Sequence, residues 1–165
     1  MTVAGTVLQV LEPLFPFKNF THVRLGLHCN DLKGCMYMMT DSDAAAIGEA
    51  LPNLQKLFFS PAYKAHNCDV TFKGLMSLSQ HCRNLMKLQT HSDLAYNNVD
   101  EPDQRLTEVV APGTSKCKLK EICVGQQGYS RSPDAPLTPA LTLNRMFSRL
   151  RRIDHSCSER SWRRV

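Results

Sequence analysis

Apolar residues in this chain recur in short groups whose first and fourth positions are apolar and whose sixth is often apolar too. The clearest group is Leu54-Gln55-Lys56-Leu57-Phe58-Phe59, which follows directly on a helical pattern. The five groups begin at Phe20, Leu54, Leu85, Leu119 and Leu150. The steps between these starts are 34, 31, 34 and 31 residues. A pattern that returns at a nearly fixed period predicts a repeat architecture.

Each group predicts a short strand, because its apolar side chains alternate with polar ones and are partly β-branched or aromatic. The predicted strands cover residues 20–25, 54–59, 85–88, 119–124 and 150–153. The inward position three residues after each start is always aliphatic: Val23, Leu57, Leu88, Ile122 and Ile153. The spacing L-x-x-L-x-L is the strand half of a leucine-rich repeat.

Helical patterns lie between these strands. Thr40 with Asp43 has the spacing of a capping box, which predicts a helix that Pro52 closes. Thr71 is the predicted N-cap of the next helix, and Thr138-Pro139 predicts the start of another, with Pro139 in its first helical position. Shorter helices are predicted over residues 2–11 and, less regularly, 106–110. Residues 26–39 are expected to be irregular.

The combined pattern predicts an α/β leucine-rich-repeat-like solenoid, with a short parallel sheet on its concave face and helices on its convex face. About five irregular repeats would fill residues 1–155, and residues 156–165 would form a basic C-terminal tail. Two alternatives are an ordinary α/β domain with similar strands and an all-helical repeat of 34 residues. Strand-like triplets such as residues 57–59 and 122–124 speak against the all-helical alternative.

Composition favours a folded, soluble chain, with 42% hydrophobic and 21% charged residues among 165. No apolar run is long enough to span a membrane, and the N-terminus has no basic segment typical of a secretory signal. A cytoplasmic or nuclear location is expected, with no membrane association. The seven cysteines form no C-x-x-C pair, so we expect neither a disulfide framework nor a metal site.

Motifs of catalysis are missing from the sequence. It contains no G-x-S-x-G, no phosphate-binding glycine loop and no H-E-x-x-H. The six histidines could pair with a cysteine or serine only by tertiary proximity, and surface or core roles explain them more simply. We expect a chain without enzymatic activity and without a cofactor.

Some of these blocks resemble the repeat region of fungal F-box proteins with leucine-rich repeats. The resemblance rests on Thr40-Asp41-Ser42-Asp43 followed by Leu51-Pro52-Asn53-Leu54, and on Val70-Thr71-Phe72 followed by His81-Cys82-Arg83-Asn84-Leu85. It covers roughly residues 8–155. The resemblance implies a horseshoe-like region that recruits a protein substrate to a ubiquitin ligase. An F-box, which would dock the ligase adaptor, is not found in this sequence.

In a leucine-rich strand, the residues that flank the inward aliphatic position point to the concave face. The position before it is occupied by His22, Lys56, Lys87, Glu121 and Arg152. The position after it is occupied by Arg24, Phe58, Gln89, Cys123 and Asp154. We expect a protein partner to bind this mostly basic face, with Phe58 as an exposed aromatic anchor and the cations supplying charge complementarity.

Charge suggests an alternative. The net charge of +5 arises entirely after residue 100, where the sequence contains twelve Lys/Arg and seven Asp/Glu. An arginine-rich C-terminal end can bind nucleic acid or an acidic partner. Few aromatic residues lie near these arginines and no nucleic-acid-binding motif is present, so nucleic acid is less favoured than a protein partner on the concave face. A further alternative is a truncated fragment without independent function; the oligomeric state is left open.

Overall fold

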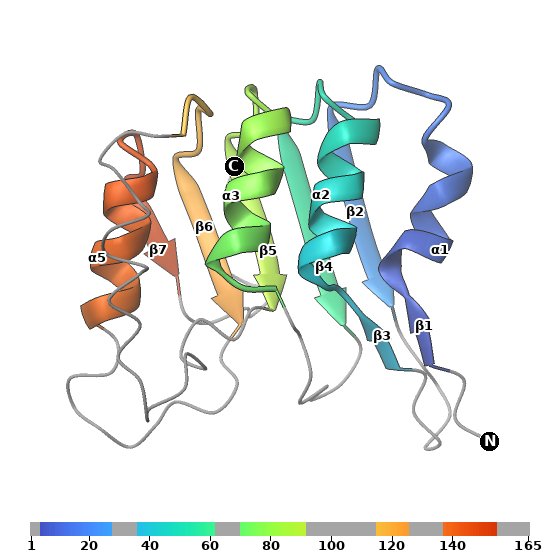
Figure 1. The fold of residues 1–165 in the computed structure, drawn as a ribbon, viewed down its shortest axis with the longest axis horizontal. Helices are drawn as coiled ribbons and strands as arrows, with labels where there is room; N and C mark the ends of the chain where they lie inside the picture. Colours follow the sequence, from blue (N-terminus) through green and yellow to red (C-terminus); the bar gives the residue numbers. More distant parts are fainter. Residues whose placement is uncertain (1–3, 28–35, 62–69, 92–114, 126–136, 155–165) are drawn as a thin grey trace.

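The computed structural model describes residues 4–27, 36–61, 70–91, 115–125 and 137–154. It is an α/β fold with one five-stranded parallel sheet (Figure 1). The strands of this sheet are β2 (His22–Leu27), β4 (Lys56–Pro61), β5 (Lys87–His91), β6 (Glu121–Gly125) and β7 (Arg152–Asp154). The helices are α1 (Val7–Leu11), the 3-10 turn η1 (Glu12–Leu14), α2 (Asp41–Ala50), α3 (Phe72–His81) and α5 (Leu137–Met146).

The strands of the main sheet lie in the order in which they occur along the chain, and every neighbouring pair is parallel. The helices form one layer that covers one face of the sheet (Figure 1). Because the fold contains a five-stranded parallel sheet, the all-helical alternative is wrong. The predicted helix at 106–110 and the predicted tail at 156–165 lie outside the described residues.

The core fills the space between the sheet and the helix layer. Leu54, Leu57 and Phe59 are each at most 1% exposed, as the repeating pattern predicts. The residues aligned with Leu57 on β5 and β6, Leu88 and Ile122, are buried to the same degree. Each strand thus contributes one aliphatic side to a continuous apolar layer that no single helix–strand unit could bury alone.

The same hydrogen bond recurs where the chain turns into β2, β4, β5 and β7. The N–H groups of Phe20, Leu54, Leu85 and Leu150 each donate to the carbonyl three residues earlier, at 3.0–3.4 Å. The predicted first residue of these groups is therefore part of a turn, and each strand begins two residues later. Directly after this turn, two successive N–H groups donate to the same carbonyl of the preceding unit. For example, the N–H groups of Gln55 and Lys56 both donate to the carbonyl of Thr21.

The N-terminal region differs from its prediction. The helix expected over residues 2–11 begins only at Val7, because β1 (Ala4–Thr6) is extended and pairs in parallel with β3 (Met36–Met38). β3 in turn lies within residues 26–39, which were expected to be irregular. β1 and β3 are extended because their backbones pair with each other across about thirty residues of sequence. Each is only three residues long, too short for an alternating pattern to predict a strand.

Helix starts follow the predicted capping chemistry. The Thr40 hydroxyl accepts from the N–H of Asp43, and the Asp43 carboxylate accepts from the N–H of Thr40 at 2.9 Å, which confirms the capping box. The Thr71 hydroxyl accepts from the N–H of Lys73 at 3.1 Å. α5 begins at Leu137, so the prediction that Pro139 is the first helical residue is wrong by two positions. Proline is tolerated at the third position because first-turn N–H groups have no intrahelical partner.

Asp41, the first residue of α2, connects that helix to the next one. Its carboxylate accepts from the N–H and the hydroxyl of Thr71, each at 2.7 Å, and from the N–H of Gly74 at 3.1 Å. The side chain thus satisfies two of the N-terminal backbone donors of α3. Gly74 is required for this approach, since a Cβ there would overlap the Asp41 carboxylate. Within the described residues, no helix is long and apolar enough to cross a membrane.

Candidate functional site

The face of the main sheet opposite the helices carries the two predicted rows of side chains. Row one, in register, holds His22, Lys56, Lys87, Glu121 and Arg152. Row two holds Arg24, Phe58, Gln89, Cys123 and Asp154. The strand pairing therefore confirms the alignment made from sequence. Alternation along each strand turns these residues away from the buried aliphatic row.

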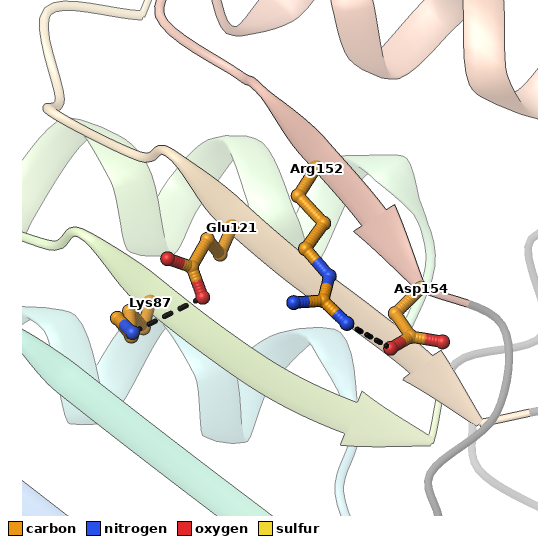
Figure 2. Close-up of polar contacts among 4 residues, drawn as sticks. All are labelled: Lys87, Glu121, Arg152 and Asp154. Atoms are coloured by element: carbon orange, nitrogen blue, oxygen red, sulfur yellow. Dashed lines mark hydrogen bonds and ion pairs between the residues drawn. The ribbon is translucent and has the colours of Figure 1, made fainter. Parts of the chain in front are cut away.

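Two ion pairs lie on the β5–β7 half of this face. Lys87 Nζ lies 3.1 Å from Glu121 Oε2, which occupies the same position on the adjacent strand. Arg152 Nη2 lies 3.1 Å from Asp154 Oδ2, two residues further along β7. Figure 2 shows all four side chains on one side of the strands, with the helices behind the sheet. These cations are matched by carboxylates of the same face.

The β2–β4 half has a different charge balance. Its four row residues are His22, Arg24, Lys56 and Phe58, so it contains cationic and aromatic groups and no carboxylate. The sequence predicted a mostly basic face across all five strands. The excess positive charge instead belongs to β2 and β4, because Glu121 and Asp154 balance the opposite half.

Exposure also varies across the face. His22 and Arg24 are exposed, whereas Lys56 and Phe58 are half-buried, so Phe58 is less open than predicted. Gln89 is only 8% exposed and Cys123 is fully buried. Gln89 therefore does not lie on an open surface, contrary to its predicted role as a contact residue. Gln89 lies on the central strand, between Phe58 on β4 and Cys123 on β6. The alternation of residues along a strand predicts which face a side chain is on, but not how far its neighbours shield it from solvent.

Three free cysteines, Cys82, Cys117 and Cys123, are buried. The Cys82 thiol donates to the carbonyl of Leu51, at 3.3 Å, in the turn that precedes β4. Burial, and to a lesser degree proximity to Cys117, raises the pKa of the Cys82 thiol to about 12. Burial also raises the pKa of Cys117. Among the described residues, no three His, Cys, Asp or Glu side chains cluster as a metal site would require.

We expect Cys82 to resist alkylation by iodoacetamide in the folded protein at pH 8, and to react rapidly once guanidinium unfolds the chain. The reason is that only the thiolate is nucleophilic, and a pKa of about 12 leaves almost no thiolate at pH 8. Peptide mapping by mass spectrometry measures labelling at this position. The raised pKa also means that the free energy of unfolding falls as pH rises from 9 toward 12, since the thiol of the unfolded chain loses its proton first. Native-state labelling of Cys82 as fast as in guanidinium would contradict the burial.

No protein-family model, curated protein or solved structure matches this chain. The two ends of the sheet face differ chemically. The β5–β7 end holds two ion pairs, and the β2–β4 end holds cations beside an aromatic ring.

Proposed function

We propose that this chain is a non-enzymatic protein-interaction module with a leucine-rich-repeat-like solenoid fold, and that it binds a protein partner on the sheet face. The observation that carries the proposal is the strand register, which aligns equivalent residues of all five units in two rows. Rows of this kind allow one partner to contact several units at once. Such extended surfaces are the usual binding sites of stacked repeats.

Three features support the solenoid architecture. The strand order follows the chain order, the helices cover one face, and the turns entering four of the five strands repeat the same hydrogen bond. An ordinary α/β domain with a doubly wound sheet places helices on both faces and changes strand order at a switch point. The one-sided layer in Figure 1 favours stacked units instead.

The resemblance to F-box proteins suggests what kind of partner this is. In that family the repeats hold a substrate for ubiquitination, so we propose that the partner is a protein substrate or an adaptor of a ubiquitin ligase. Lys56 and Phe58, side by side with His22 and Arg24 on β2, are the residues proposed to contact it. An aromatic ring flanked by cations is a common centre of binding energy.

The proposal predicts which substitutions weaken binding. A photoreactive phenylalanine analogue at position 58 should crosslink a protein partner, which can then be purified. Phe58→Ala should weaken binding of that partner by about tenfold or more, because hot-spot aromatics carry much of an interface's energy. Lys56→Glu should have a comparable effect by reversing the charge. Fluorescence anisotropy with the purified partner measures both affinities.

Lys73→Glu provides the matched control. Lys73 is exposed on the helix layer, and its substitution changes the net charge by the same amount as Lys56→Glu. It should leave the affinity within about twofold, as a screened charge outside the interface does. Equal loss for Lys56→Glu and Lys73→Glu would point to a nonspecific charge effect. Unchanged affinity in both Phe58→Ala and Lys56→Glu would refute the sheet face as the binding site.

A further inference from the structure

A second charged surface lies along the edge of the sheet where the chain enters the strands, at the top of Figure 1. The described segments that lead into β5, β6 and β7 are residues 82–86, 115–120 and 147–151. We call their basic residues the basic edge. Its six members are Arg83, Lys116, Lys118, Lys120, Arg149 and Arg151. All six side chains are exposed, and these three described segments contain no acidic residue.

Parallel stacking is what brings these residues together. The N–H of Lys118 donates to the carbonyl of Arg83 at 3.2 Å, and the N–H of Arg151 donates to the carbonyl of Lys120 at 2.8 Å. Neighbouring strands lie about 4.8 Å apart, so cations that are about thirty residues apart in sequence become adjacent. Within the described part of the chain, no ion pair involves any of the six.

Local helix chemistry explains only part of this cluster. Arg83 and Arg149 follow the C-termini of α3 and α5, where a cation is favourable because of the helix dipole. Lys116, Lys118 and Lys120 enter β6 from a segment in which the structure describes no helix. Lys118 also donates from Nζ to Asn84 Oδ1 at 3.0 Å, which holds its charge at the edge.

The edge is basic at one end only. The connections that enter β2 and β4, residues 15–21 and 51–55, contain a single cation, Lys18. Arg152, which the sequence groups with the C-terminal arginines, is paired with Asp154 on the sheet face and does not belong to the edge. Among the described strands and the segments that lead into them, the positive charge after residue 100 thus divides between a balanced sheet face and an unbalanced edge.

We propose that the basic edge binds an acidic polypeptide segment, separately from the sheet face. Six exposed cations without carboxylates form a complementary surface for several Asp or Glu side chains. A single-stranded nucleic acid would also be attracted, but such ligands gain affinity by stacking on exposed aromatic rings. The only aromatic residue in these three described segments, Phe147, is 2% exposed, so they supply charge without a stacking platform.

Fluorescence anisotropy with the full chain tests this proposal. The probe is a fluorescein-labelled peptide of alternating Glu and Ser; a Gln–Ser peptide and an oligodeoxythymidine of equal charge are compared with it. The Glu–Ser peptide should bind most tightly, and its affinity should fall as salt increases. Lys120→Glu combined with Arg151→Glu should raise its Kd by about tenfold or more, and the corresponding Gln variants by less.

The matched control combines Lys18→Glu with Lys73→Glu, two exposed sites away from the basic edge with the same total change in charge. It should change the Kd by less than about twofold, since charges beyond a Debye length are screened. Circular dichroism checks that every variant is folded. Tighter binding of the oligodeoxythymidine would identify the edge as a nucleic-acid site. Absence of peptide binding, or equal losses in the two double variants, would also overturn the proposal.

Discussion

Replacing Leu57 with Ala is expected to lower the free energy of unfolding by about 2–5 kcal/mol, because the substitution leaves a cavity in a close-packed core. Leu57 is 1% exposed and lies between Val23 and Leu88 in the buried row of the sheet. The loss should appear as a lower denaturant midpoint at unchanged slope. Urea unfolding followed by circular dichroism measures it.

Phe58→Ala is the natural control, because the two residues are adjacent in sequence but project from opposite faces of β4. Phe58 is half-buried, so its truncation should cost clearly less than that of Leu57. The comparison also establishes that Phe58→Ala is folded, which its use as a binding variant requires. A larger loss for Phe58→Ala than for Leu57→Ala would contradict the assignment of the helix-covered face as the core.

Asp41→Ala is expected to destabilise the chain by about 2–3 kcal/mol, since hydrogen bonds to a charged acceptor are stronger than neutral ones. The substitution leaves the N–H groups of Thr71 and Gly74 without their carboxylate acceptor. The first turn of α3 should therefore exchange its amide hydrogens faster than the rest of that helix. Hydrogen exchange with mass spectrometry, together with urea unfolding, measures both effects.

Glu49→Ala serves as its control. Glu49 is also a carboxylate on α2 that faces α3, but its side chain is 67% exposed and lies 3.8 Å from His81. Surface ion pairs contribute little, so the change should stay within about 0.5 kcal/mol. Gly74→Ala should destabilise the chain on its own by about 1–3 kcal/mol, through overlap with Asp41. Combined with Asp41→Ala, it should cost less than the sum of the two single changes.

The two proposed surfaces differ in a way that makes them separable. The sheet face offers Phe58 with nearby cations, whereas the basic edge offers charge alone. Binding at the edge should therefore depend steeply on salt, and binding at the sheet face should depend more on the aromatic ring. Lys56→Glu and the paired change at Lys120 and Arg151 are thus independent tests.

The repeating pattern by itself determined the five strands of the main sheet, to within two residues at their starts, and their register. Apolar positions such as Leu54, Leu57 and Phe59 alternate locally, and the period brings equivalent residues to equivalent places in every unit. The capping box was equally readable, because Thr40 and Asp43 interact across a single turn. These features depend on residues close to one another in sequence, where spacing alone fixes geometry.

Contacts between units were decided only by the tertiary structure. Asp41 has an obvious local role at the start of its own helix, yet its carboxylate serves Thr71 thirty residues away. The pairing of Lys87 with Glu121, the burial of Gln89 and the gathering of the basic edge likewise depend on which strands are neighbours. The sequence contains the charges, but only stacking sets the distances between them, and distance determines whether a charge is balanced or available to a partner.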